Sequence, residues 1–222
     1  MPPGGAGYAR FVDKTVRKLL DTAGRTYAEE AGISLRNSPA PLYQLLVLTV
    51  LLSARIKADI AVAAARELFT AGAKTPGKML ELSWQERVDA LGRGHYVRYD
   101  ESTATTLGDG ARFVLDRYDG DLRGMWDASE GDRKKLRKLL TEVKGIGPTG
   151  AEIFCREAQA VWPELRPHLD KKALDGARRL GLPQDPGKLA ERVPEDRLAA
   201  LAAALVRVTL DRSLAEELRS AA

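Results

Sequence analysis

The stretch Val143-Lys-Gly-Ile-Gly-Pro-Thr-Gly150 joins two segments whose apolar residues recur at helical spacing. These apolar residues are Leu136, Leu139, Leu140 and Val143 before the glycines, and Ala151, Phe154, Cys155 and Ala158 after them. Gly147 can cap the second helix, and Pro148 suits the first helical position, where its missing N–H costs nothing. The stretch therefore predicts a helix, a tight Gly-x-Gly hairpin and a second helix.

The hairpin is a candidate binding site for an anionic oxygen. Gly145 and Gly147 let the backbone approach a partner closely, and the second helix begins there with unpaired N–H groups and the positive end of its dipole. Lys144 stands in the turn, and the preceding helix adds further cations: Arg133, Lys134, Lys135, Arg137 and Lys138. A DNA phosphate is therefore the best candidate partner. Because a lone Gly-x-Gly is a weak signal, a plain helical corner stays open as the alternative.

Composition is that of a soluble globular protein, with 44% hydrophobic and 30% charged residues in a chain of 222. The formal charge of +4 is compatible with nucleic acid. The single Cys155 excludes internal disulfides and an iron–sulfur cluster, and two histidines, His95 and His168, speak against a histidine metal site. The chain starts without a secretory signal, and its longest apolar run, Leu45–Leu52, is too short to span a membrane. We therefore expect a cytoplasmic protein.

Helical periodicity continues through the rest of the chain, with no convincing strand and no internal repeat. Residues 1–7 are expected to form a disordered tail, and residues 8–31 a helix. The segment Leu42–Ala54 is apolar on all sides, which is typical of a helix buried at a domain centre. Other helices are expected to end near Phe69, Tyr118 and Gly181, and a last one to run from about Asp196 to Leu218. The predicted fold class is all-α, with about ten helices.

The order of these parts resembles the helix-hairpin-helix DNA glycosylase superfamily, and within it the endonuclease III branch. The matching parts are the buried helix ending Leu51-Leu52-Ser53-Ala54, the segment Lys74–Leu82, the loop Gly94–Tyr96, the hairpin Val143–Gly147, and Asp170 at the head of the next helix. The resemblance implies a two-lobed fold, with a helical barrel over residues 36–162 that carries the hairpin. Residues 8–35 and 163–222 would form the second lobe, and DNA would lie in the cleft between the lobes.

The same resemblance implies a function and a partner. It implies a DNA-repair glycosylase of base excision repair, which hydrolyses the N-glycosidic bond of a damaged or mispaired base turned out of the duplex. The partner would be double-stranded DNA with a base lesion or an abasic site, bound by a nucleoid-associated monomer without membrane contact. No cofactor is implied beyond a monovalent cation at the hairpin backbone, because the cluster-binding cysteines of many members are missing here.

Two positions depart from the family pattern. Bifunctional members carry a catalytic lysine two residues past the second hairpin glycine, where this chain has Thr149. The residues after the aspartate, often Thr-His, are Lys171 and Lys172 here. The resemblance therefore favours base release with weak or no AP-lyase activity. A non-catalytic binder of DNA or abasic sites is the alternative, and an all-helical interaction protein without a DNA role is a third reading.

Asp170 suits the chemistry that breaks an N-glycosidic bond. Positive charge builds on the sugar in an oxocarbenium-like transition state, and a fixed carboxylate beside it favours that state. At about 4 Å and an effective dielectric near 20, opposite unit charges attract by roughly 4 kcal/mol, or about a thousandfold in rate. A helix N-terminus favours the ionised form that this role requires. The alternative is that Asp170 only caps its helix, which is a common position for aspartate.

Other candidate residues lie in two loops. The resemblance assigns Arg55 to the position that enters the duplex when a base is turned out, with Lys57 contacting the DNA backbone. A solvated turn is the alternative for both residues. In the later loop, His95, Tyr96 and Tyr99 interleave with Arg98, a composition suited to stacking a base and holding phosphate. The two tyrosines could instead cover the barrel core.

Overall fold

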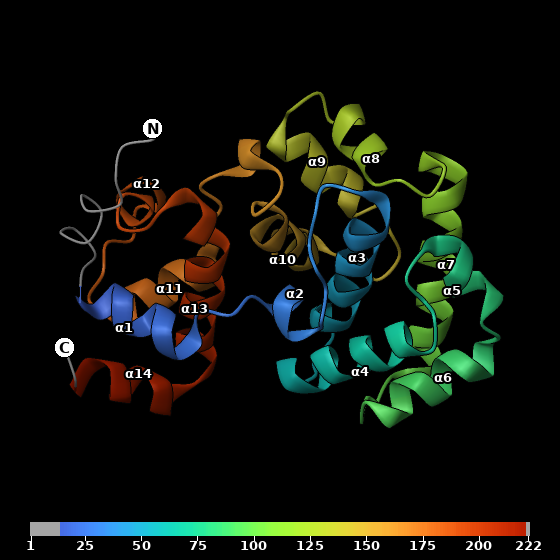
Figure 1. Ribbon diagram of the computed structural model, residues 1–222, viewed down its shortest axis with the longest axis horizontal. Coiled ribbons are helices and arrows are strands. Elements are labelled where there is room, and N and C mark those ends of the chain that lie inside the picture. Colours follow the sequence, from blue (N-terminus) through green and yellow to red (C-terminus); the bar gives the residue numbers. More distant parts are fainter. Residues whose placement is uncertain (1–13, 221–222) are drawn as a thin grey trace, which may run out of the picture. The chain divides into compact units, whose positions relative to one another are not determined.

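A computed structural model describes residues 14–220, and every regular element in that part of the chain is a helix (Figure 1). The predicted all-α fold is therefore confirmed. Fourteen α-helices occur over these residues, rather than about ten, because two expected long helices are divided and two short helices, Arg123–Ala128 and Pro186–Ala190, were not expected. Over the same residues, no helix is long and apolar enough to cross a membrane.

The chain forms two compact units. One unit is Tyr27–Glu164, and the other combines residues 14–26 with residues 165–220. The sequence predicted domain boundaries between residues 35 and 36 and between residues 162 and 163. Residues 27–35 were therefore expected in the same unit as the N-terminal helix. In the structure they belong to the first unit, where the carboxylate of Glu157 accepts hydrogen bonds from the backbone N–H of Tyr27 at 3.4 Å and of Ala28 at 2.9 Å.

The continuous helix expected over residues 8–31 is wrong for the part that the structure describes. Helix α1 is Lys14–Ala23, and α2 is a separate helix, Tyr27–Glu30. The apolar spacing runs on across the break, but Glu157 binds the first N–H groups of α2 and thereby starts a new helix. The part of the expectation before Lys14, including the tail at residues 1–7, lies outside the described residues.

The unit Tyr27–Glu164 is built around α3. Its helices after α2 are α3 (Pro39–Ser53), α4 (Ala58–Thr70), α5 (Pro76–Glu81), α6 (Trp84–Arg93), α7 (Asp100–Tyr118), α8 (Arg123–Ala128), α9 (Arg133–Leu140) and α10 (Pro148–Ala158). Helix α3 is buried from Leu42 to Leu51 except at Gln44, and it packs against α4, α7 and α10. The predicted buried central helix is confirmed. It begins earlier than expected, because the first turn of a helix tolerates proline.

The other unit is built around a second apolar helix, α13. Its helices are α1, α11 (Lys171–Arg179), α12 (Pro186–Ala190), α13 (Leu198–Leu210) and α14 (Arg212–Ser220). Helices α1, α11 and α14 all pack on α13. The single helix expected over residues 196–218 is wrong, because the chain is extended at Asp211 and its carboxylate accepts the N–H of Ser213 at 2.8 Å, which starts α14.

Candidate nucleic-acid interface

The helix, hairpin and helix predicted at residues 136–158 are present in the structure. Helix α9 ends at Leu140, and α10 begins at Pro148 with Gly147 as its N-cap. Between them, Gly145 has a φ of +87°, a left-handed conformation that an L side chain rarely adopts. The local prediction is therefore confirmed, including the position of the proline in the first turn of α10.

The two hairpin glycines serve different purposes. A Cβ atom at Gly145 would lie 2.6 Å from Cγ2 of Thr106 and 3.2 Å from Cγ1 of Val50, so packing and the positive φ both require glycine there. Gly147 has an ordinary φ of −94°, and a Cβ atom there would meet no atom of residues 14–220 within 4 Å. The fold therefore needs glycine at 145 but not at 147. At 147, glycine leaves an exposed stretch of backbone open to an outside partner.

The N-terminus of α10 offers hydrogen-bond donors at this opening. The first intrahelical bond runs from the N–H of Ala151 to the carbonyl of Gly147 at 3.0 Å, so the N–H of Thr149 and of Gly150 precede the ladder. Gly147 has no side chain to cap them, and Thr149 is exposed. Together with the positive end of the helix dipole, these groups form a surface suited to an anion.

The turn between α3 and α4 lies beside the hairpin. A Cβ atom at Gly150 would lie 2.5 Å from Oγ of Ser53, so the start of α10 rests directly on the end of α3. Arg55 and Lys57 follow this contact within four residues, and both side chains are exposed. The structure thus brings both residues next to the hairpin, in the same unit. Sequence reasoning gave Gly150 no role, because its requirement for glycine comes from a helix about a hundred residues earlier in the chain.

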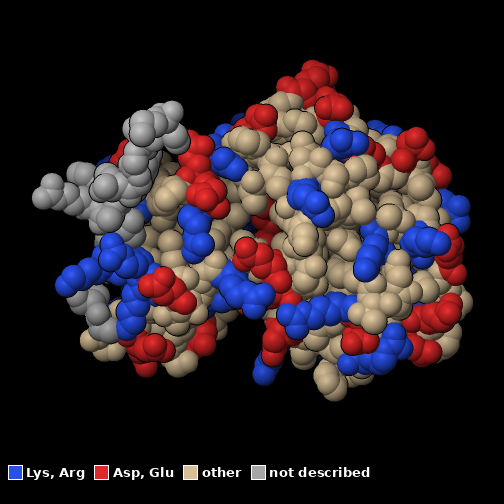
Figure 2. Space-filling view, viewed as in Figure 1, with Lys and Arg blue, Asp and Glu red and all other residues tan. Residues whose placement is uncertain are grey.

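Fewer cations are available around the hairpin than the sequence suggested. Lys144 forms an ion pair with Asp109 of α7. On α9, Lys135 pairs with Glu130 at 2.7 Å, Arg137 pairs with Glu152 at 3.2 Å, and Arg133 donates to the carbonyl of Glu164 at 2.8 Å. Only Lys134 and Lys138 of this helix are fully exposed. On the face drawn in Figure 2, basic and acidic side chains are likewise interspersed.

The loop before α7 is partly core. Tyr96 has no exposed surface, and its hydroxyl lies 3.5 Å from Oγ1 of Thr103, so it cannot stack on an incoming base as one of the two interpretations required. His95 is exposed with a φ of +62°, and the guanidinium of Arg98 lies 5.1 Å from the centre of the Tyr99 ring. His95 and Tyr99 therefore remain the residues of this loop that could reach a ligand.

Asp170 is the N-cap of α11 in the other unit. Its Oδ1 accepts a hydrogen bond from the N–H of Ala173 at 2.9 Å, which fixes the half-buried carboxylate at the start of the helix. Helix α11 is itself held firmly against α13, because a Cβ atom at Gly176 would lie 1.9 Å from the carbonyl oxygen of Leu205. Lys171 and Lys172 beside the aspartate are both exposed.

Neither Cys155 nor a metal site contributes to the candidate interface over the described residues. Cys155 is buried within α10, and burial raises the pKa of its thiol to about 12, as suits inert packing. Residues 14–220 contain no group of three or more His, Cys, Asp and Glu that could hold a metal ion. A monovalent cation at the hairpin backbone stays a prediction.

Comparison with solved structures identifies the fold. The chain is similar to a trapped covalent endonuclease III–DNA intermediate in an estranged-adenine complex, with 16% identity, a TM-score of 0.50, and 86% of this chain and 81% of that chain covered. A non-covalent endonuclease III–DNA complex gives 16% identity, a TM-score of 0.51 and coverage of 86% and 80%. A thermostable thymine-DNA glycosylase gives 16% identity, a TM-score of 0.52 and coverage of 88% for both chains.

Sequence comparison adds nothing to this result. No protein-family model matches the chain, and no curated protein matches it. At 16% identity, the likeness rests on the arrangement of the helices over more than four-fifths of the chain. The protein therefore has the helix-hairpin-helix fold of endonuclease III and thymine-DNA glycosylase.

Proposed function

We propose that this protein is a DNA glycosylase of base excision repair, which hydrolyses the N-glycosidic bond of a damaged or mispaired base. The fold it shares with endonuclease III and thymine-DNA glycosylase supports the reaction class. The proposal is carried by one observation: Asp170 is a carboxylate fixed at the start of a packed helix, in a chain that also has a glycine hairpin open to a phosphate.

The hairpin would hold the DNA backbone. The first N–H groups of α10 can donate to phosphate oxygens, and Gly147 keeps the space in front of them clear. Glycosylases act on a base turned out of the stack, which leaves a gap in the duplex. Arg55, exposed beside the hairpin, would fill this gap while Lys57 contacts the backbone. Lys171 and Lys172 would hold the phosphates that flank the reacting sugar.

Asp170 would stabilise the reacting sugar. A water oxygen bonds to C1′ of the deoxyribose, the C1′–N bond breaks, and the base leaves with the bonding electrons and takes up the proton that the water loses. Positive charge on the sugar is greatest in the transition state, so a fixed carboxylate at about 4 Å lowers the barrier by roughly 4 kcal/mol. That corresponds to a rate increase of about a thousandfold.

Substitution of Asp170 by asparagine tests the assignment. We expect Asp170→Asn to release base about a thousandfold more slowly and to bind DNA within about threefold of the unchanged protein. The substrates are duplexes with a G·T mispair, an oxidised base or an alkylated base, and hot alkali reveals the abasic sites. Asp185→Asn is the matched control, because Asp185 caps α12 in the same unit by accepting the N–H of Lys188 at 2.8 Å. Equal rates for the Asp170 variant and the unchanged protein would refute the role.

Thr149 predicts that strand cleavage is inefficient. A threonine cannot form the imine with an abasic sugar that lyase chemistry requires. We therefore expect little covalent trapping when the protein, abasic-site DNA and borohydride are combined. Thr149→Lys supplies an amine at an exposed position of the first turn of α10 and should increase trapping. Strong trapping of the unchanged protein would contradict this expectation and point to another lysine.

A non-catalytic binder of DNA or abasic sites is the second candidate. It is favoured by the capping bond of Asp170 to Ala173, because a carboxylate can be retained for that purpose alone. The lesion panel separates the two candidates. Salt-dependent binding without release of any base would support the binder, whereas release from one class of lesion would support the glycosylase.

A further inference from the structure

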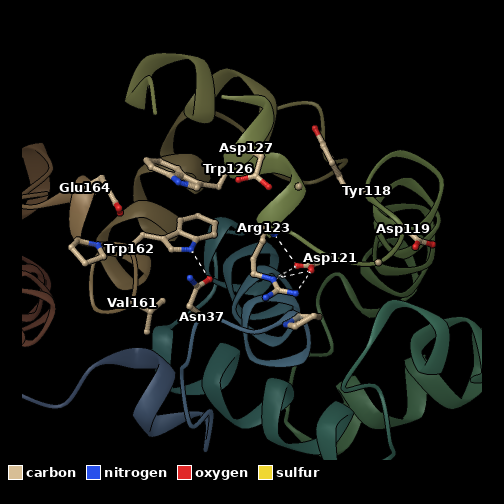
Figure 3. A pocket seen from close by; sticks show the side chains of 14 residues that line it. Asn37, Tyr118, Asp119, Asp121, Arg123, Trp126, Asp127, Val161, Trp162 and Glu164 are labelled. Atoms are coloured by element: carbon tan, nitrogen blue, oxygen red, sulfur yellow. Dashed lines mark hydrogen bonds and ion pairs between the residues drawn. The ribbon is translucent and has the colours of Figure 1, made fainter. Parts of the chain in front are cut away.

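A cavity of about 720 Å³ lies at the C-terminal end of α10, within the unit Tyr27–Glu164 (Figure 3). Its wall contains two stacked indoles, Trp126 and Trp162, whose ring centres are 5.4 Å apart. Trp162 is almost fully buried and donates from Nε1 to Oδ1 of Asn37 at 3.0 Å, while Trp126 is partly exposed. A volume of this size is in the range of ligand sites, roughly 300 to 1,000 Å³.

The lining of this cavity is acidic. Four carboxylates line it (Asp119, Asp121, Asp127 and Glu164), together with one cation, Arg123. Arg123 binds Asp121 through two of its nitrogens, at 2.6 and 2.8 Å, and these hydrogen bonds lower the pKa of the Asp121 carboxyl. The other three carboxylates are exposed. An anionic cavity on a protein of net charge +4 attracts cations and repels phosphate.

The cavity lies away from the hairpin in the same unit. Helix α3 contacts the hairpin near Ser53, and its other end at Pro39 lines the cavity. Helix α7 contacts the hairpin at Thr106, and its end at Tyr118 lines the cavity. Along each helix the two places are about 18 to 21 Å apart at 1.5 Å per residue. A ligand in the cavity would therefore leave the hairpin accessible.

We propose that this acidic, indole-lined cavity binds an arginine side chain from a basic segment of a partner protein. A guanidinium can stack on the partly exposed ring of Trp126 and bind the carboxylate of Asp127, while Glu164 lines the cavity on the other side of the indoles (Figure 3). Asp127 follows Trp126 directly, and Glu164 is two residues beyond Trp162, so each indole has a carboxylate beside it (Figure 3). The site is independent of the proposed glycosylase activity.

Arginine fits this arrangement better than lysine does. The guanidinium is planar, stacks on aromatic rings and presents paired donors that match a carboxylate, whereas an ammonium is a compact and strongly hydrated point charge. The cavity volume of about 720 Å³ is also larger than one arginine side chain, so it leaves room for part of the peptide around that side chain. A segment with several arginines would in addition meet the third exposed carboxylate, Asp119.

Titration with labelled peptides tests the proposal. The probes are acetylated and amidated peptides that carry three arginines, three lysines or three glutamates separated by glycines, together with arginine amide as the free small molecule. Fluorescence anisotropy and calorimetry measure binding to the full chain. The variants are Asp127→Asn with Glu164→Gln, and separately Trp126→Ala. Glu101→Gln is the matched control, because Glu101 is an exposed carboxylate of the same unit at the far end of α7 from the cavity.

We expect the arginine peptide to bind most tightly and the lysine peptide to bind with an affinity at least about threefold lower. The glutamate peptide should not bind. The double variant should weaken binding of the arginine peptide by about tenfold, Trp126→Ala by about fivefold, and Glu101→Gln by less than about twofold. Unchanged affinity in the double variant or equal affinity for arginine amide would each overturn the proposal. Loss of base release in Asp170→Asn would leave it untouched.

Discussion

The two ends of α10 differ in almost every respect. At its N-terminus, Gly147 has no side chain, Thr149 is exposed, and a Cβ atom at Gly147 would meet no described atom within 4 Å. At its C-terminus, Trp162 is buried, stacks on Trp126 and lies 5.7 Å from the ring centre of Phe154. The N-terminal end of α10 thus presents backbone donors, whereas aromatic and acidic side chains from other segments gather beyond its C-terminal end. Side-chain packing stabilises the C-terminal end of α10. The N-terminal end lacks such packing at Gly147 and is therefore accessible.

The largest expected effect is at the packed end. Trp162→Ala removes a buried indole and its contacts, which should lower the free energy of unfolding by about 3 to 5 kcal/mol. Trp84→Ala is the control, because Trp84 is 41% exposed and should cost about 1 kcal/mol or less. Denaturant titration measures both values. If Trp162→Ala costs no more than Trp84→Ala, packing at the C-terminal end of α10 does not stabilise the fold.

The hairpin glycines give the next largest difference. Gly145→Ala combines a positive φ with a contact of 2.6 Å to Thr106, so we expect a loss of about 2 to 4 kcal/mol in unfolding free energy. Gly147→Ala should change stability by less than about 0.5 kcal/mol and weaken duplex binding by about tenfold.

Gly77 provides the control for both hairpin variants. A Cβ atom there would also meet no atom of the described residues within 4 Å, and Gly77 lies in α5, away from the hairpin turn. Gly77→Ala should leave duplex affinity unchanged in an anisotropy assay. Full affinity in Gly147→Ala would mean that no partner approaches the backbone there, and the hairpin would then be a plain helical corner.

The smallest expected effect concerns the ion pair beside the hairpin. Asp109→Asn removes the partner of Lys144 and should tighten duplex binding by about twofold to threefold, because exposed ion pairs contribute little. The dependence of affinity on salt should become steeper by up to about one phosphate contact. Lys144→Ala combined with Asp109→Asn should remove this gain. If Asp109→Asn alone leaves the salt dependence unchanged, Lys144 does not contact DNA.

Local patterns decided what the sequence could predict. The hairpin and the buried helix α3 were predicted because glycine, proline and apolar spacing act within a few residues of one another. The breaks between helices near residues 24–26 and at Asp211 were missed because the apolar spacing continues across both of them. At the first break the carboxylate of Glu157 starts a new helix, and at the second the carboxylate of Asp211 does so. The ion pair of Lys144 could not be predicted, since Asp109 lies 35 residues earlier in the chain.

The cavity beside Trp162 was missed for a similar reason. Its wall is assembled from three separate segments, of which Asn37, Trp126 and Trp162 are representatives. None of these segments has a recognisable motif. The sequence likewise gave the same two interpretations for Tyr96 and Tyr99, which lie in one loop. In the structure Tyr96 is buried and Tyr99 is partly exposed. Such differences depend on neighbours that are distant in the chain.

The hydrogen bonds of Glu157 to α2 have a consequence for how the chain assembles. Glu157, in the last turn of α10, binds the first residues of the unit Tyr27–Glu164, and the unit ends six residues after α10 does. The start and the end of this long segment are therefore joined by hydrogen bonds, which closes the segment into a loop. Once the loop has closed, the N-terminal helix and the C-terminal helices are tethered as if by a short linker, which reduces the entropic cost of their docking. The segment is in this sense an insertion, and we expect it to fold first.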